Sequence, residues 1–219
     1  PLVRTLQSHQ DYYQQWAQNW EFQALLKARP VAGDRELGKA YYDMAQQFVW
    51  KASQRENFVY DCQQMRKRVE SLIPAPLKDR EIKLGKGGLR DVEFTVQMLQ
   101  LVHGRSDESL RTTATIDSLN ALARGGYVSR NQAERLARDY SFERVLEHRR
   151  QMWSLKRTHL FPDLGPGSIG GIERSRELNR DALDANIELR RLARSLGMHA
   201  DELVERFDAT RREVRRLHQ

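Results

Sequence analysis

Apolar residues recur along most of the chain at spacings of three and four, which is the period of an amphipathic α-helix. No stretch alternates apolar and polar residues over a convincing length, so no strand is predicted. The sequence therefore predicts an all-α helical bundle. The expected helices cover residues 8–29, 35–52, 54–72, 89–103, 113 or 115 to 125, 129 to about 158, 182–196 and 203–217.

Several boundaries carry recognisable local signals. Asp34 can cap the second helix, Ser129 and Gln132 form a capping box for the long one, and Gly197 suits the left-handed position after a helix. The segment PDLGPGSIGG (162–171) is the clearest linker. We divide the chain into a region 1–110, which contains a glycine-rich motif at 83–94, and a C-terminal helical bundle 111–219 that includes the linker.

Composition narrows the class of protein. The charged fraction is 31%, and no apolar run approaches the ~18 residues that a membrane-spanning helix needs. The one cysteine, Cys62, excludes an internal disulfide framework and favours the cytoplasm. We expect Cys62 and the four tryptophans to pack in the core or between helices. The formal net charge of +7 suits either a solvated arginine-rich surface or a polyanionic partner.

The basic residues are spread over many helices, and aromatic residues do not alternate with them as in proteins that bind single strands. A basic helical nucleic-acid module therefore stays an alternative, although nucleic acid is not the expected partner. No histidines stand at metal-ligand spacing, so no metal site is expected in this chain.

The highest concentration of candidate functional residues lies in the stretch IKLGKGGLRDVEFTVQMLQLVHGR (82–105). Apolar residues cover about 220° of the predicted helix 89–103, so this helix should be central to its bundle. Its polar residues share one narrow stripe, which should face solvent, a cleft or another domain. The stripe consists of Arg90, Glu93, Gln97 and Gln100. Asp91 lies in the first turn, where a carboxylate can accept main-chain N–H bonds.

The glycine-rich start of this stretch has two interpretations. Gly87 and Gly88 allow close approach to another group, a helix N-terminus offers N–H groups to an anion, and Lys83, Lys86 and Arg90 add positive charge. Alternatively, the glycines form a tight turn and the lysines lie in water. The run is neither a Walker A motif nor a dinucleotide-binding fingerprint, because no G-K-[ST] follows and no strand precedes it.

Two long segments resemble one enzyme family. KLGKGGLRDVEF (83–94) is similar to a signature of the bacterial glutamine synthetase adenylyltransferase, also called the adenylyl-transferase/adenylyl-removing enzyme, and DYYQQWAQNWEFQALLKARPVAGD (11–34) resembles its second hallmark. RTHLFPD and REVRRLH resemble later pieces in an actinobacterial style. A related glycine-rich signature occurs in the uridylyltransferase that modifies the PII signal protein, so a fragment of that enzyme is a further alternative. The WEFQALLKARPVAGD segment argues against it.

The resemblance implies an enzyme of two halves, each with a polymerase-β-type nucleotidyltransferase domain followed by a helical bundle. One half adds AMP to a tyrosine of glutamine synthetase, and the other removes it by phosphorolysis. The form GGLRDVEF indicates the N-terminal, adenylyl-removing half. Mg²⁺ with ATP, ADP or phosphate would serve the full-length enzyme. The implied partners are glutamine synthetase, a PII-type signal protein and the enzyme's own nucleotidyltransferase domain.

The carboxylates of that chemistry are not expected in this chain. The family's reaction needs an Asp-x-Asp pair for Mg²⁺, and no such pair occurs in the sequence. We therefore expect the catalytic domain upstream of Pro1, next to region 1–110. No catalytic residue, metal or bound cofactor is expected within 1–219, and the chain alone should be inactive.

The resemblance also suggests individual roles. Lys27 and Arg29 would face the catalytic domain and hold a phosphate or an acidic substrate, although both also suit the C-terminal end of a helix dipole. Glu21 would pair with one of them or lie in solvent.

The strongest candidates for phosphate or carboxylate contact are Lys83 and Arg90, with Gly87 and Gly88 beside them. Asp91 and Glu93 would support Mg²⁺ or orient Arg90. We favour a structural role for both carboxylates.

Overall fold

The computed structural model describes residues 3–164 and 186–218. The linker from residue 165 onward and the polar stretch 172–181 lie outside the described residues. Those described contain no strand, which confirms the all-α prediction. The helices are α1 (Leu6–Gln15), α2 (Asn19–Leu25), α3 (Arg35–Val49), α4 (Phe58–Ser71), α5 (Leu89–His103), α6 (Thr115–Arg124), α7 (Arg130–Ser154), α10 (Ile187–Ser195) and α11 (Ala200–His218). Short 3₁₀ turns occur at Ala52–Gln54, Ala75–Leu77 and Glu108–Leu110.

The chain forms two compact units, and each is assembled from two stretches of sequence. Unit 1 consists of residues 1–68 and 94–133, and unit 2 of residues 69–93 and 134–219. Helices α4, α5 and α7 contribute residues to both. This division differs from the sequence-based one at 110/111, which followed chain order and could not include contacts between distant segments.

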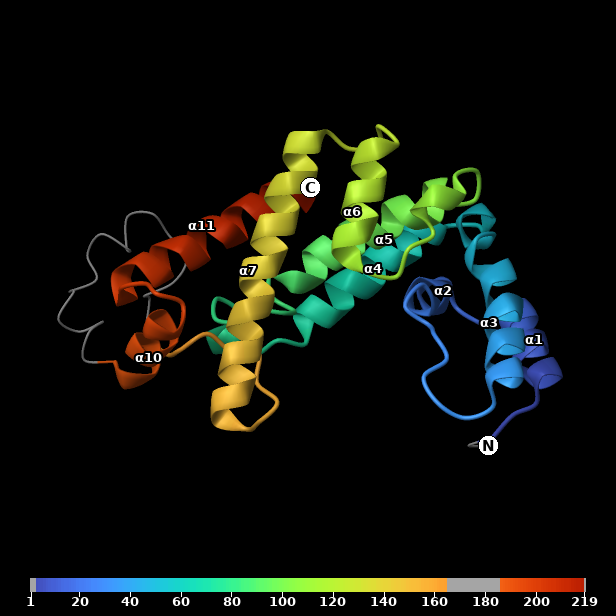
Figure 1. Cartoon of the computed structure of the whole chain (residues 1–219). Coiled ribbons are helices and arrows are strands. Elements are labelled where there is room, and N and C mark those ends of the chain that lie inside the picture. Colours follow the sequence, from blue (N-terminus) through green and yellow to red (C-terminus); the bar gives the residue numbers. More distant parts are fainter. Residues whose placement is uncertain (1–2, 165–185, 219) are drawn as a thin grey trace. The chain divides into compact units, whose positions relative to one another are not determined.

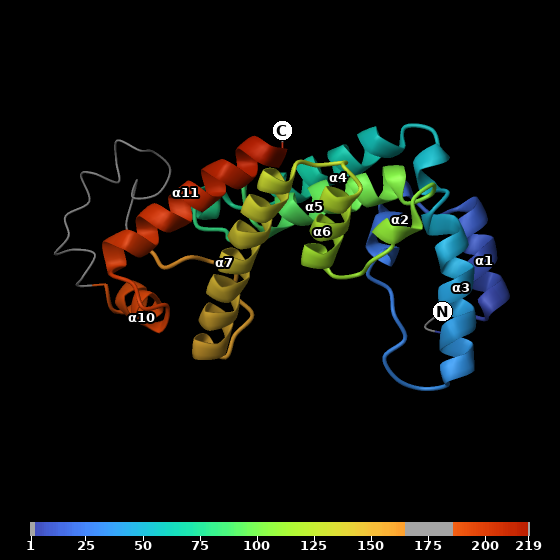
Figure 2. The ribbon, with the colours of Figure 1, turned by 45° about the horizontal axis from the view of Figure 1, so that its top comes forward.

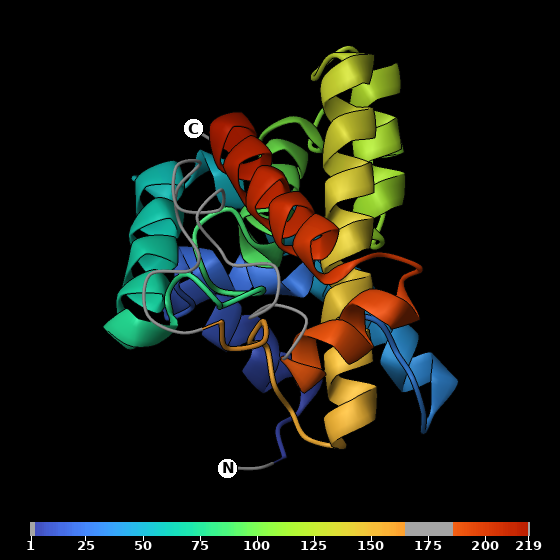
Figure 3. The same ribbon diagram turned by 90° about the vertical axis from the view of Figure 1, so that its left-hand side faces the viewer.

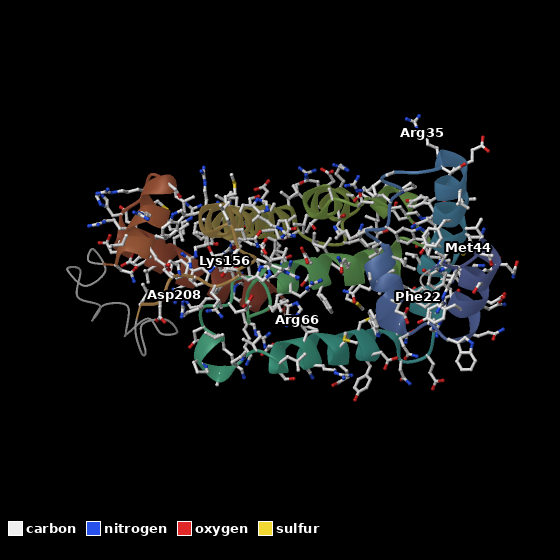
Figure 4. All side chains as sticks on the ribbon, turned by 90° about the horizontal axis from the view of Figure 1, so that it is seen from below. Phe22, Arg35, Met44, Arg66, Lys156 and Asp208 are labelled. Carbon is white, nitrogen blue, oxygen red and sulfur yellow. The ribbon has the colours of Figure 1, made fainter. Side chains whose placement is uncertain are left out.

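Unit 1 is built on an aromatic core from its N-terminal helices. Tyr13 of α1, Phe22 of α2 and Phe48 of α3 pack together, with ring centroids 5.9–6.5 Å apart. Figure 1 shows α1 and α3 side by side in this unit, and Figure 4 places Phe22 on α2 near Met44 on α3. Cys62 and Trp50 are buried in the same cluster, as the sequence predicted.

The prediction of one continuous helix over 8–29 was wrong. The chain breaks after α1, and Gln18 begins α2 as its N-cap, with the Gln18 main-chain N–H donating to Glu21 Oε1 at 2.8 Å. This local capping outweighs the continuous apolar period. The break leaves Trp16 69% exposed, and Trp20 and Trp153 are 41% and 43% exposed, so the prediction of a core position was wrong for these three tryptophans.

Other boundary predictions are confirmed. The side chain of Asp34 caps α3, and Ser129 and Gln132 make the reciprocal bonds of a capping box at the start of α7. Gly197 has a left-handed φ of +69° between α10 and α11. Helix α7 ends at Ser154, short of the predicted residue 158, where Leu155 takes a left-handed φ of 48°.

Unit 2 places α11 beside α7 (Figure 3), and α10 leads into α11 (Figure 2). The stacked rings of Phe161 and Phe207, both fully buried, form its centre with centroids 4.2 Å apart. The first part of the glycine-rich loop, which we define as residues 78–88, pairs with the segment after α7: Ile82 N donates to the His159 carbonyl, and Phe161 N donates to the Arg80 carbonyl. None of the described helices is long and apolar enough to cross a membrane.

Candidate functional site

Most of the polar stripe of α5 is buried within the chain. Gln97 accepts a hydrogen bond from Gln23 at 2.9 Å, and Gln100 donates to the carbonyls of Leu110 and Thr112 at 2.7 and 2.9 Å. Glu93, in the first turn, is 7% exposed. Burial of the stripe against other segments of the same chain corrects the expectation that it faces solvent, a cleft or another domain.

The main-chain N–H groups at the start of α5 donate within the chain. Gly87 N bonds Asp91 Oδ2 at 2.7 Å, as the first-turn position of this aspartate predicted. Gly88 N bonds the Gly85 carbonyl, Leu89 N the Ile82 carbonyl and Arg90 N the Lys83 carbonyl, at 2.9–3.1 Å. A helix N-terminus can hold an anion when these groups are available, but here they are used by the loop itself.

The glycines of the loop stand where there is no room for a side chain. A Cβ on Gly87, whose φ is +71°, would lie 2.0 Å from the Arg211 carbonyl oxygen of α11. A Cβ on Gly88 would lie 2.3 Å from the Ile82 carbonyl oxygen. The geometry is that of a tight turn packed against another helix, so any phosphate contact in this region depends on side chains.

A set of polar side chains, which we call the arginine network, lies beside the loop. It consists of Glu93, Tyr140, Arg144, Glu147 and His159. Arg144 donates to Glu93 at 2.6 Å, to Glu147 at 2.7 Å and to the Tyr140 hydroxyl at 3.0 Å. His159 Nδ1 lies 2.7 Å from the other oxygen of Glu147. One guanidinium thus joins two buried carboxylates from α5 and α7.

The network lowers the pKa of the Glu147 carboxyl. Burial by itself would raise that pKa, but the hydrogen bond and positive charge of Arg144, with the charges of Lys83 and His159, outweigh it. Glu147 is therefore an ionised acceptor at neutral pH, and the network is held by charge rather than by neutral hydrogen bonds.

Lys83 and Arg90 lie at opposite ends of the arginine network. Lys83 Nζ is 3.8 Å from Glu147 Oε1, and Arg90 Nη1 is 3.5 Å from Glu93 Oε2. Their side chains are 23% and 34% exposed. Three cations, Lys83, Arg90 and Arg144, thus meet the buried carboxylates of Glu93 and Glu147.

Two further candidates of unit 2, Lys86 and Asp91, lie outside the arginine network. Lys86 is 62% exposed and lies 3.6 Å from Glu70. Asp91 is fully buried, with Arg215 and His218 of α11 3.9 and 3.8 Å from its oxygens. Glu93 Oε2 lies 3.5 Å from Arg90 Nη1, so the two residues form an ion pair across three positions of α5.

Neither Asp91 nor Glu93 fits Mg²⁺, because N–H groups and cations already surround their oxygens. Within the described residues, no three His, Cys, Asp or Glu side chains gather closely enough to hold a metal ion.

Two of the three candidates of unit 1, Lys27 and Glu21, form hydrogen bonds within their own unit. Lys27 donates to the Thr113 carbonyl and, at 3.1 Å, to Thr115 Oγ1 at the start of α6. Arg29 is exposed. The expected pairing of Glu21 with one of these cations was wrong, because its carboxylate accepts from the Tyr12 hydroxyl and from its own helix cap.

Sequence reasoning missed Arg144, Glu147, His159 and Arg211. The three-residue spacing of Arg144 and Glu147 within the predicted long helix could have marked them as an ion pair. No local signal marks His159 or Arg211, because their partners are distant in the sequence.

The comparisons with known proteins first define a class. A family model described as "GlnD PII-uridylyltransferase" matches residues 62–165, and one described as "Glutamate-ammonia ligase adenylyltransferase" matches residues 1–44. The all-α chain, with its glycine-rich loop and arginine network, is thus similar to parts of nucleotide-transferring enzymes.

Whole-chain relatives identify the family. The chain is 72% identical over 217 residues to the bifunctional glutamine synthetase adenylyltransferase/adenylyl-removing enzyme of Bifidobacterium longum subsp. infantis, covering 99% of the chain and 20% of that relative. It is 53% identical over 219 residues to the Cutibacterium acnes enzyme of the same name, and 62% identical over 162 residues to that of Mycolicibacterium smegmatis, which covers 74% of the chain and 16% of the relative. The chain belongs to this family and spans about one fifth of the length of its first two relatives.

Proposed function

We propose that this chain is the helical segment of a bifunctional glutamine synthetase adenylyltransferase/adenylyl-removing enzyme, from the half that removes AMP. The observation that carries the proposal is 72% identity over 99% of the chain to an enzyme of that name. The form GGLRDVEF supports the adenylyl-removing half. The uridylyltransferase alternative is not favoured, because relatives that match over 99% and 100% of the chain are named adenylyltransferase/adenylyl-removing enzymes.

In this proposal, the side chains of Lys83 and Arg90 contact a phosphate group during removal of AMP. An oxygen of inorganic phosphate attacks the phosphorus of the AMP–tyrosine ester, the tyrosine oxygen leaves, and ADP forms. Two cations held 3.8 and 3.5 Å from carboxylates, with side chains that are 23% and 34% exposed, suit a second anionic partner. Gly87 and Gly88 shape the loop, and Glu93 and Glu147 orient the two cations.

The catalytic carboxylates would come from outside this chain. The sequence has no Asp-x-Asp pair, and Asp91 and Glu93 do not fit Mg²⁺. We propose that the nucleotidyltransferase domain holds Mg²⁺ and the nucleotide, that Lys27 and Arg29 lie toward it, and that the isolated chain is inactive.

We propose glutamine synthetase as the protein substrate and a PII-type signal protein as a further partner, in the cytoplasm. The net charge of +7 suits an acidic partner surface.

The first experiment substitutes Arg90→Met in the whole enzyme, with Lys86→Met as a matched control from the same loop. Loss of a charge-assisted contact to phosphate should lower kcat/KM for AMP removal by about 10- to 100-fold. Lys86→Met should stay within about twofold, because this exposed side chain lies outside the arginine network. Unchanged AMP removal in Arg90→Met would reduce the loop to a structural turn, and loss of AMP addition instead would contradict the assignment to the removing half.

A second experiment tests the isolated chain. The purified 219-residue protein should form no labelled adenylyl-glutamine synthetase from ATP and Mg²⁺. It should also release no ADP from adenylylated glutamine synthetase and phosphate. Either product, at a rate proportional to the chain's concentration, would place catalytic groups within residues 1–219.

A further inference from the structure

One side chain of α11 ties together the two ends of the glycine-rich loop. The Arg211 guanidinium donates through Nε to the Lys86 carbonyl and through Nη2 to the Lys78 carbonyl, both at 3.1 Å, and through Nη1 to the Asp79 carbonyl. The first two acceptors stand on either side of Lys83. A single planar group with its donors in a fixed fork therefore holds the entry and the exit of the loop in one arrangement.

The main chain of α11 adds a second hold at the same place. The Arg211 carbonyl oxygen fills the space next to the Gly87 Cα, where a Cβ would lie 2.0 Å away. Further along the helix, Arg215 and His218 approach the buried carboxylate of Asp91, which itself accepts from Gly87 N. Helix α11 thus contacts the loop through backbone atoms, and it contacts the first turn of α5 through charged side chains.

The surroundings of Arg211 favour one position of its side chain. The guanidinium carbon lies 5.5 Å from the centre of the Phe207 ring, which stacks on Phe161. Negative charge near Arg211 comes from Asp79 of the loop, Asp91 of α5 and Asp208 of α11, and the buried carboxyl group of Glu143 in α7 also faces it. Attraction from the three aspartates holds the cation between the loop, α5 and α11, so removal of this side chain should release the loop.

We propose that Arg211 is a positioning residue that fixes the conformation of residues 78–88 and, through it, the presentation of Lys83 and Arg90 to phosphate. The inference that Arg211 fixes the loop follows from its contacts and does not depend on the proposed function of the chain. Its effect on the reaction rests on the function proposed above for Lys83 and Arg90. Two measurements separate these parts.

The first measurement is amide hydrogen exchange in the 219-residue chain. Arg211→Met should speed exchange at Gly88, Leu89 and Arg90 at least tenfold relative to wild type, because their acceptors lie in the loop. Arg211→Lys should give an intermediate effect, since one ammonium cannot serve three carbonyls in a fork. Arg212→Met is the matched control, an exposed neighbour on the same helix, and amides within α7 serve as the internal reference.

Equal loop exchange in Arg211→Met and Arg212→Met would overturn the proposal. If Arg211→Met fails to fold, Arg211→Lys decides, because it keeps the charge on α11. Exchange at wild-type rates in the lysine variant would then overturn the proposal.

The second measurement is AMP removal by the whole enzyme carrying the same variants. Arg211→Met should raise KM for inorganic phosphate at least tenfold, while AMP addition stays within twofold. A general loss of folded enzyme would instead lower the apparent kcat and leave KM unchanged. Faster loop exchange with an unchanged KM for phosphate would overturn the proposed effect of Arg211 on the reaction and the phosphate-binding role of the loop. The proposal that Arg211 fixes the conformation of residues 78–88 would still stand.

Discussion

The carbonyl oxygen of Arg211 occupies the space beside Gly87 in which any other residue would carry its side chain. A Cβ built there would stand 2.0 Å from that oxygen and 2.8 Å from the carbonyl carbon. Because both atoms belong to the backbone of a helix, neither can move without moving α11. The glycine-rich loop and α11 are therefore packed at backbone contact.

Substitution of Gly87 by alanine should destabilise the fold by about 3 kcal/mol or more, since it adds a main-chain collision to the strain of a left-handed φ. Gly197→Ala is the matched control: its φ is +69°, but nothing lies within 4 Å of the added Cβ. Strain alone should cost the control about 1–2 kcal/mol. Urea denaturation of both variants measures the difference, and equal losses would show that α11 does not limit this position.

Glu143 should make the stability of the fold depend on pH. The side chain is fully buried, and its carboxyl oxygens accept no hydrogen bond from the described residues. Burial raises the pKa of this carboxyl well above 4.5, although the positive charge of Arg211 opposes the shift. Between its unfolded and folded pKa values, the folded protein holds one proton more than the unfolded chain, so stability falls as pH rises.

In that pH range, wild type should lose about 1.4 kcal/mol per pH unit relative to Glu143→Gln, which cannot ionise. Denaturation at intervals from pH 5 to pH 8 gives the two profiles. Glu134→Gln, an exposed change on the same helix, should follow wild type. Parallel profiles for wild type and Glu143→Gln would show that Glu143 is ionised in the folded protein.

Arg144 should be the residue on which the arginine network depends. Arg144→Leu leaves the buried carboxylates of Glu93 and Glu147 without their shared partner and should cost about 3 kcal/mol. Arg216→Leu, which removes a 60% exposed cation paired with Glu213, should cost less than about 1 kcal/mol.

The Arg144 variant also has a pH signature. Since the folded pKa of Glu147 is lowered, its contribution is present above pH 4.5 and is lost as pH falls through the folded value. The advantage of wild type over Arg144→Leu should therefore shrink in acid. An advantage that stays constant down to pH 3 would indicate that Arg144 acts through packing alone.

Elements with local signals could be predicted from the sequence, and elements decided by tertiary contacts could not. Helix α5 followed from its apolar arc and α7 from its capping box, because both signals lie within a few residues of the boundary they determine. The break between α1 and α2 was missed because Trp16 and Trp20 continue the helical period across it. The helical spacing of apolar residues indicates which residues could share one face of a helix, but it does not show that the helix is continuous.

The candidate site divides in the same way. Lys83 and Arg90 flank the glycines in the sequence, so their proximity could be anticipated. The role of Arg144 depends on α7 packing beside α5, and that of Arg211 on the last helix reaching the loop. Neither packing has a sequence signal, because an arginine on a polar helix face usually lies in solvent. The narrow polar stripe of α5 was noticed, but its partners lie on segments far away in the chain.

The hydrogen bond between the side chains of Gln23 and Gln97 tests whether the polar stripe of α5 stabilises unit 1. Both side chains are buried, at 3% and 6% exposure, and their amides are joined at 2.9 Å. Gln97→Leu or Gln23→Leu leaves one amide buried without this bond and should cost about 1–3 kcal/mol. The double variant removes both amides, so its loss should fall short of the sum by about 1 kcal/mol or more. Gln7→Leu, which breaks an exposed bond to Asp11, should change stability by less than about 0.5 kcal/mol. Strictly additive losses in a urea-denaturation cycle would show that the two glutamines do not stabilise each other.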